Sequence, residues 1–246
     1  MKQILMVLSI LFFSFNTISA QINSDTIRPL SIGETRVFKS DILDENRILN
    51  IYLPNNYDKQ VAYPVIYLLD GSVNEDLIHI SGLVQFFNMM FQMPDFIVIG
   101  IANVDRKRDF TFPTVLKDLK EKYPTTGGSA KFIDFIEKEL QPFIQKNYKT
   151  TETKYIIGQS LGGLLASEIL LKRPSLFTHY FIISPSLWWN NESLLDEAKE
   201  ILSRQPDNNL YVYISVGAEG KLMEYGAEKL AKALNKSKKK NLRVDF

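Results

Sequence analysis

Six short apolar runs, separated by segments of helical periodicity, constrain the fold of this chain most strongly. The runs are Pro64–Leu69, Phe96–Ile101, Tyr155–Ile157, Tyr180–Ile183, Leu210–Val216 and Leu242–Phe246. Continuous apolar runs of this length are typical of strands that are covered on both faces, as in a parallel sheet. Strands that alternate with helices predict a doubly wound α/β sheet. In such a sheet, ligand sites lie beyond the carboxyl ends of the strands.

Two further strands and three helices complete the predicted architecture. Residues Arg47–Leu53 alternate between apolar and polar, as in a half-buried strand, and Val37–Leu43 is the expected antiparallel partner. A helix with Ser129 as its N-cap is expected to extend to the region of Pro142, which should bend it. The other two helices are predicted over the ranges Leu161–Lys172 and Met223–Leu234.

The first twenty residues carry the features of a secretory signal peptide. Lys2 precedes a short apolar core, Ile4–Phe15, and polar and small residues follow up to Ala20. The core is shorter than the roughly 20 apolar residues that a spanning helix needs. We therefore predict cleavage after residue 20, an exported (periplasmic or secreted) protein without stable membrane insertion, and one domain over residues 21–246. An uncleaved membrane anchor is the alternative.

Charge and cysteine content exclude several classes of function. The 246 residues include 29 basic and 28 acidic side chains, a net charge of +1. Proteins that bind nucleic acid usually carry a marked basic excess or stripe, and the one dense basic run, Lys236–Lys240, is typical of a solvated helix end. The absence of cysteine excludes disulfides, a thiol nucleophile and cysteine-ligated zinc. Without an HExxH motif, or a GxGxxG motif after a strand, no metal and no other cofactor is predicted.

A G-x-S-x-G motif is the strongest functional signal, and it spans residues 158–162 between a predicted strand and a predicted helix. Such a sharp turn leaves little room for side chains two positions before and after the serine, and Gly158 and Gly162 meet that need. Ser160 would then stand above the sheet at a helix N-terminus, which favours developing negative charge. The amide of Leu161 would point toward an oxyanion. A structural glycine-rich turn with an idle serine is the alternative.

Several motifs accompany this turn in the chain. They are Tyr67-Leu68-Leu69-Asp70-Gly71, Gly100-Ile101-Ala102-Asn103, Arg106 with Arg108-Asp109-Phe110-Thr111, Gly127-Gly128, Ser184-Pro185-Ser186-Leu187-Trp188-Trp189 and Ser215-Val216-Gly217-Ala218-Glu219-Gly220. From Arg36 to Phe246 the chain thereby resembles esterases of the esterase D and enterochelin-esterase type, within the α/β-hydrolase fold. The resemblance implies cleavage of carboxylic esters without a cofactor. It makes Ser160 the nucleophile, Leu161 one oxyanion donor, and Gly71 or Ser72 the second.

The acid and the base of such a site follow the serine in the order Asp or Glu, then His. Glu219, just beyond the predicted strand Leu210–Val216, fits the acid, and a solvated loop glutamate is the alternative. No histidine follows Glu219. A helix of about 18 Å separates His179 from Ser160, which excludes His179 as the base. His79, after the strand Pro64–Leu69, is a second candidate base and otherwise a helix-surface residue.

We interpret the missing histidine as a C-terminal truncation within the last strand, which removes the base and a closing helix. One alternative is a natural hydrolase-like binding protein that lacks the catalytic histidine. The other is an acyltransferase, which passes the acyl group to an acceptor other than water.

Two arginines and two tryptophans follow strands at the predicted active edge. Guanidinium groups suit carboxylate or phenolate groups, which makes Arg106 and Arg108 candidates for substrate binding. Trp188 and Trp189 are candidates for stacking on an aromatic or sugar group. We therefore expect a small-molecule ester as the substrate, such as a siderophore, aromatic or sugar ester. The alternatives are surface ion pairs with neighbouring aspartates for the arginines and internal packing for the tryptophans.

Overall fold

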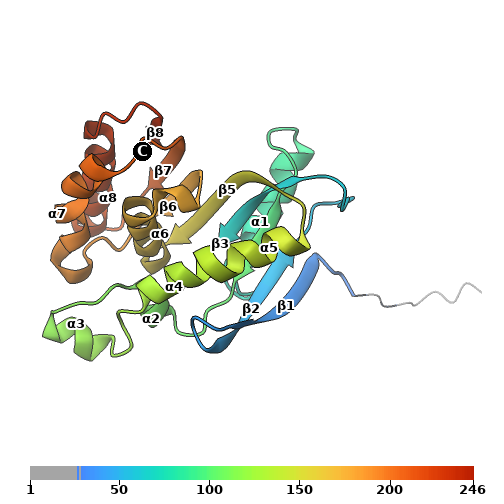
Figure 1. Ribbon diagram of the computed structural model, residues 1–246, viewed down its shortest axis with the longest axis horizontal. Helices are drawn as coiled ribbons and strands as arrows, with labels where there is room; N and C mark the ends of the chain where they lie inside the picture. The colour runs from blue at the N-terminus through green and yellow to red at the C-terminus, as the bar shows by residue number, and fades with distance from the viewer. Residues whose placement is uncertain (1–26, 28) are drawn as a thin grey trace, which may run out of the picture. The chain divides into compact units, whose positions relative to one another are not determined.

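An eight-stranded sheet with the order β1-β2-β4-β3-β5-β6-β7-β8 is the centre of the unit formed by residues 32–246 (Figure 1). The structure is a computed structural model that describes residue 27 and residues 29–246. The signal peptide predicted for residues 1–20 lies outside the described residues and remains a prediction. Among the described residues, no helix is both long enough and apolar enough to span a membrane.

The strands confirm a mostly parallel sheet that begins with an antiparallel hairpin. Their bounds are β1 (Gly33–Ser40), β2 (Glu45–Tyr52), β3 (Tyr63–Leu68), β4 (Ile97–Ile101), β5 (Thr150–Gln159), β6 (His179–Ile183), β7 (Leu210–Ser215) and β8 (Leu242–Asp245). β2 pairs antiparallel with both β1 and β4, and the remaining neighbours are parallel. The first strand ends at Ser40 rather than at Leu43, because residues 41–44 form the turn and Asp44 has a left-handed φ of 53°.

From β3 onward, one or more helices separate each strand from the next. Their bounds are α1 (Leu77–Met89), α2 (Arg106–Phe110), α3 (Lys117–Lys122), α4 (Ser129–Phe135), the π-helical η1 (Ile136–Leu140), α5 (Gln141–Asn147), α6 (Leu161–Lys172), the 3₁₀ turn η2 (Pro174–Leu176), α7 (Trp189–Arg204) and α8 (Lys221–Lys236). The predicted cap at Ser129 is wrong, since Gly128 occupies the N-cap position. The widened turns of η1 lie directly before Pro142, whose ring and missing N–H a regular α-helix would not accommodate.

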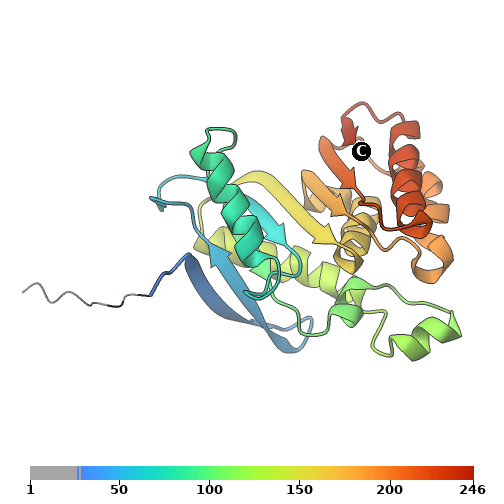
Figure 2. The same ribbon diagram turned by 180° about the vertical axis from the view of Figure 1, so that it is seen from behind.

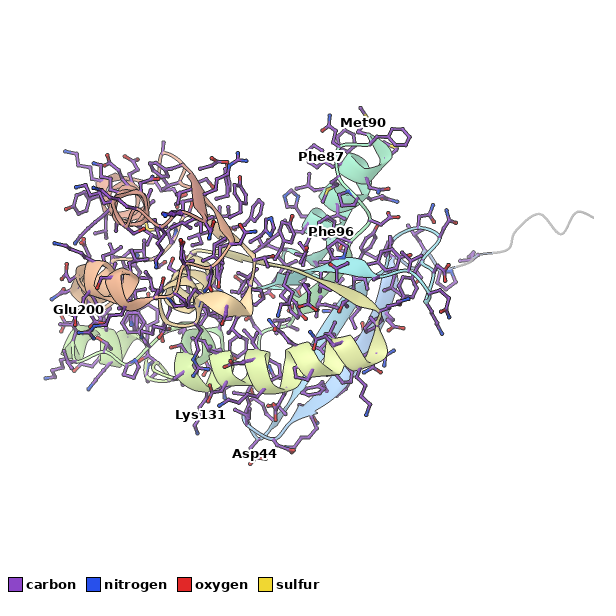
Figure 3. The ribbon with its side chains drawn as sticks, turned by 45° about the horizontal axis from the view of Figure 1, so that its top comes forward. Asp44, Phe87, Met90, Phe96, Lys131 and Glu200 are labelled. Atoms are coloured by element: carbon purple, nitrogen blue, oxygen red, sulfur yellow. The ribbon has the colours of Figure 1, made fainter. Side chains whose placement is uncertain are left out.

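Helices cover the two faces of the sheet unequally. The larger core lies on the face that packs against α4, α5, α6, α7 and α8. A smaller core under α1 includes Ile66, Val84 and Phe96, and Figure 2 shows α1 alone in front of the sheet from that side. Figure 3 shows Phe87 and Met90 at the far end of α1, where both are exposed, while Phe96 is buried at the base of the helix.

Candidate active site

Ser160 occupies a strained turn between the end of β5 and the start of α6. Its φ of 56° and ψ of −116° lie in a region that costs a non-glycine residue about 1–3 kcal/mol and persists only where the surroundings hold it. The Ser160 amide donates to the Ile183 carbonyl at 3.0 Å, and its own carbonyl accepts from the amides of Leu164 and Ser186 at 2.9 and 3.0 Å. The predicted strand, sharp turn and helix are therefore present.

The glycines around this serine are required to different degrees. A Cβ on Gly158 would lie 2.3 Å from the Gly162 carbonyl oxygen, so only glycine fits there. A Cβ on Gly162 would meet its nearest neighbours at 3.4 Å or more, which is ordinary contact, so the predicted need for glycine is not seen at this position. A Cβ on Gly163 would approach the Ile183 carbonyl oxygen at 2.9 Å. Gly163, rather than Gly162, is the second glycine that the packing requires.

The Ser160 hydroxyl is half-buried, and its Oγ lies 3.2 Å from the Oγ of Ser186. Leu161 is the first residue of α6. The first four amides of a helix have no intrahelical acceptor. The Leu161 amide therefore has the place in the fold that an oxyanion donor beside Ser160 needs, and its role remains a prediction.

The loop after β3 holds the two residues predicted for the second oxyanion donor. The Gly71 amide donates to the Ile101 carbonyl at 3.0 Å. Because this hydrogen bond uses its one N–H, Gly71 does not fit the predicted role of oxyanion donor in this structure. The Ser72 amide donates to the Glu75 carboxylate at 3.2 Å. Because that acceptor is a side chain and can move aside, Ser72 remains the candidate for the second donor.

Glu219 follows β7 and lies at the same edge of the sheet as Ser160. Its carboxylate accepts hydrogen bonds from the Ser184 hydroxyl and from the Gly217 amide, the latter at 3.3 Å. Ser184 is two residues from Ser186, whose hydroxyl contacts Ser160, and two residues span at most about 7 Å. Sequence reasoning assigned no role to Ser184 and Ser186, although both lie in a motif that carries the resemblance. The catalytic role of Glu219 remains a prediction.

The sheet register places His179 far from the nucleophile. His179 begins β6 and pairs with Tyr155, five residues before Ser160 in the neighbouring strand, which is about 16 Å along the sheet. The His179 ring stacks on Tyr155 with 4.1 Å between centroids, and its Nδ1 lies 2.8 Å from the Thr178 hydroxyl. This geometry agrees with its exclusion as the base. His79 is exposed in the first turn of α1, on the carboxyl side of the sheet.

Both arginines predicted to bind the substrate form ion pairs with carboxylates of the protein. The Arg106 guanidinium donates to the Asp70 carboxylate at 2.6 and 2.9 Å and to the Gln159 carbonyl at 3.2 Å. Burial lowers the pKa of Arg106, but the hydrogen bond to Asp70 and the nearby negative charges of Asp70, Glu75 and Asp76 together outweigh this effect, and the net change is a rise. Arg108 donates to Glu45 at 2.6 Å and to Asp109 at 2.8 Å. Contact of either arginine with a substrate remains a prediction.

The two tryptophans differ in exposure. Trp189 is completely buried, its indole N–H donates to the Phe112 carbonyl at 2.9 Å, and its ring packs against Tyr123. Because it presents no surface to a ligand, the predicted stacking role does not fit Trp189, and internal packing describes it instead. Trp188 is half-buried and remains a candidate for contact with a substrate.

Two hollows on the described part of the chain lie away from Ser160. One of about 580 Å³ lies between α7 and α8 and is lined by Tyr225 and Lys229, among others. The other, of about 560 Å³, lies near the amino ends of β6 and β7 around His179. In residues 27 and 29–246, no group of three or more His, Cys, Asp or Glu side chains is placed to hold a metal ion.

A mostly parallel sheet with a strained serine between a strand and a helix defines the α/β-hydrolase fold. The family described as "Putative esterase" matches residues 40–245. The chain belongs to this family and is a carboxylic-ester hydrolase.

Known relatives support the same assignment. The ferri-bacillibactin esterase BesA of Bacillus subtilis is 33% identical over 215 residues, which are 80% of this chain and 73% of that protein. The BES protein of Bacillus cereus superposes with a TM-score of 0.79 at 29% identity, and the match covers 90% of each chain. An IroE-like serine hydrolase of Shewanella oneidensis superposes with a TM-score of 0.75 at 31% identity, over 86% of this chain and 72% of that one.

Proposed function

We propose that this protein is an exported serine esterase in which Ser160 attacks the carbonyl carbon of an ester. The strained backbone of Ser160 carries the proposal, because a turn of this kind lifts the hydroxyl out of the sheet at a helix N-terminus. Attack forms the bond between Oγ and the carbonyl carbon while the hydroxyl proton passes to a general base. The resulting oxyanion would accept hydrogen bonds from the amides of Leu161 and Ser72.

Collapse of that intermediate expels the alcohol, which takes the proton, and leaves the acyl group on Ser160. Water then hydrolyses this acyl-enzyme by the same steps. Glu219 would orient the base, as its place after β7 at the edge that holds Ser160 suggests. Of the two histidines in the sequence, only His79 lies at this edge.

Siderophore esters are the proposed substrates. The support comes from the relatives, which include a ferri-bacillibactin esterase at 33% identity. A direct comparison of kcat/KM for a ferric siderophore ester and for a feruloyl sugar ester tests this choice. A higher value for the siderophore ester is expected, and a higher value for the feruloyl ester would contradict it.

The contact of the Ser160 hydroxyl with the Ser186 hydroxyl, and not with a histidine, is the observation behind a second candidate function, a binding protein that retains an ester without turning it over. The two functions differ in one measurement, because a binding protein shows saturable affinity for the siderophore ester and no release of acid. Substitution His79→Gln tests the remaining histidine. Loss of turnover as large as in Ser160→Ala would make His79 the base, and unchanged turnover would exclude it.

Substitution Ser160→Ala tests the nucleophile. We expect the rate of p-nitrophenyl ester hydrolysis to fall to the level of the buffer, because the proposed acyl-enzyme cannot form without the Ser160 hydroxyl. The matched control is Ser175→Ala, which removes an exposed hydroxyl in η2, at the other edge of the sheet. Retained turnover in Ser160→Ala would refute the assignment.

A further inference from the structure

One guanidinium joins the two backbone segments that the proposed chemistry uses. Arg106, at the start of α2, donates to both carboxylate oxygens of Asp70 at 2.6 and 2.9 Å. Its Nη2 also donates to the Gln159 carbonyl at 3.2 Å. Asp70 is the first residue of the oxyanion loop, defined here as residues 70–72, and Gln159 directly precedes Ser160. The side chain therefore bridges the oxyanion loop and the nucleophile turn.

The backbone at Asp70 needs such support. Asp70 is buried, with 7% of its surface exposed, and its φ of 54° is left-handed. A non-glycine residue in this conformation persists only where its surroundings determine it. Besides Arg106, the Asn103 side-chain amide donates to Asp70 at 2.7 Å. The Asp70 carboxylate is also near the first turn of α6, since a Cβ on Gly162 would lie 3.4 Å from its Oδ2.

Asn103 and Glu75 extend this network to the oxyanion donor. The Asn103 amide also donates to Glu75 at 3.0 Å, and the other Glu75 oxygen accepts from the Ser72 amide at 3.2 Å. Burial raises the pKa of Glu75, but its hydrogen bonds with Ser72 and Asn103, together with the positive charge of Arg106, outweigh that effect and lower the pKa overall. Asp70, Arg106 and Asn103 thus hold the loop, and Glu75 accepts from the Ser72 amide until an oxyanion takes its place.

The same contacts occupy the edge of Arg106 that would bind a ligand carboxylate in a bidentate pair. A guanidinium has five N–H donors, and the edge formed by Nε and Nη2 is the fork that grips a carboxylate in a bidentate pair. In this structure Asp70 occupies that fork and Gln159 accepts a third bond from Nη2. A substrate carboxylate would have to displace a buried carboxylate of the protein to bind in the same way.

We propose that Asp70 and Arg106 form a clamp that holds the oxyanion loop against the nucleophile turn, and that Arg106 is a positioning residue. This inference rests on the proposed function of Ser160 as the nucleophile. Its chemistry is distinct from a substrate-binding role, because the clamp sets the distance between the attacking oxygen and the amides that stabilise the oxyanion. Loss of the clamp should therefore affect the transition state of any ester.

Substitution Arg106→Gln tests the clamp against substrate binding. We expect kcat to fall by about 100-fold on an anionic and on a neutral p-nitrophenyl ester alike, with KM unchanged within about threefold, since a shift of about 1 Å can cost this much. A substrate-binding arginine would instead raise KM for the anionic ester and spare the neutral one. That selective rise in KM would overturn the proposal.

A double-mutant cycle tests whether the two residues act as one unit. Asp70→Asn and Arg106→Gln should each lower kcat, and the double variant should lose no more than either single variant. Independent, additive losses would overturn the clamp. The matched control is Arg173→Gln, which removes a guanidinium that likewise pairs with two carboxylates, Asp134 and Glu137, away from the site. It should leave kcat unchanged.

Hydrogen exchange gives a readout that does not depend on turnover. In Arg106→Gln, amides in the peptide 70–76 should exchange at least tenfold faster than in the wild type, while amides of β6, residues 179–183, keep their rates. The clamp requires both the faster exchange in residues 70–76 and the fall in kcat. If the wild-type protein shows no turnover, the exchange measurement alone tests the clamp. If residues 70–76 of Arg106→Gln exchange at the wild-type rate, the clamp is overturned. Turnover that survives Ser160→Ala would refute the nucleophile and leave the exchange test valid.

Discussion

At the scale of single residues, the site depends on close backbone contacts that permit only certain side chains. Gly158 faces the backbone of Gly162 at a distance that leaves no room for a Cβ. The strained conformation of Ser160 lies at this contact between β5 and α6. Two hydrogen bonds maintain it, one from the Ser160 amide to the Ile183 carbonyl at the end of β6 and one from the Ser186 amide to the Ser160 carbonyl. The reactivity proposed for Ser160 thus depends on the local backbone.

Substitution Gly158→Ala should disrupt this geometry. The new methyl group would lie 2.3 Å from the Gly162 carbonyl oxygen, so β5 and α6 must separate, and overpacking of this kind costs about 1–3 kcal/mol. We expect a lower free energy of unfolding in urea and a loss of hydrolysis of about 100-fold. The control is Gly82→Ala in α1, where a Cβ meets nothing within 4 Å and should add about 0.5–1 kcal/mol of stability. Equal stability of the two variants would contradict this account.

Sequence reasoning located the turn around Ser160, which depends on adjacent elements, and missed contacts between residues that are distant in the chain. Ser160 and Leu161 follow from a motif between a strand and a helix. No local sequence pattern encodes the hydrogen bond from the Gly71 amide to the Ile101 carbonyl. The same holds for the complete burial of Trp189, whose indole donates to the Phe112 carbonyl. The partner of Arg106 is likewise 36 residues away in the chain.

At the scale of elements, apolar runs predicted where strands lie better than where they end. β5 extends from Thr150 to Gln159, although the apolar signal covers only Tyr155–Ile157. The residues before Tyr155 are polar and only partly buried, yet they pair with β3, so backbone pairing determines the length of this strand. The π-helical turns of η1 were not predicted, since periodicity alone does not distinguish them from an α-helix.

Protonation of His179 at the start of β6 should weaken the fold. Burial lowers the pKa of His179 below its ordinary value of 6.5, so the unfolded chain binds the proton more readily. The stabilisation is complete above pH 6.5 and is lost as the pH falls from there toward the folded-state pKa. We expect Tm to drop between pH 7.5 and 5.5, and to drop less in His179→Phe, which keeps an aromatic ring beside Tyr155. Equal drops in the two proteins would contradict this expectation.

At the scale of the whole molecule, the parallel sheet brings the candidate site together. Asp70, Ser160, Ser184 and Glu219 each follow a different strand, and the parallel register places those strand ends at one edge. The alternation of strands and helices in the sequence is sufficient to predict this gathering, as well as the fold class. The hydrogen bonds that link the four loops depend on side-chain packing and required the structure.

Covalent labelling of Ser160 by a fluorophosphonate tests the central claim most directly. The full-length protein is treated with the probe, digested, and analysed by mass spectrometry, with Ser160→Ala and acid-unfolded protein as controls. The account predicts one added phosphonyl group on the peptide that contains Ser160, and none in either control. Labelling of a different residue, or equal labelling of the Ser160→Ala variant, would contradict it.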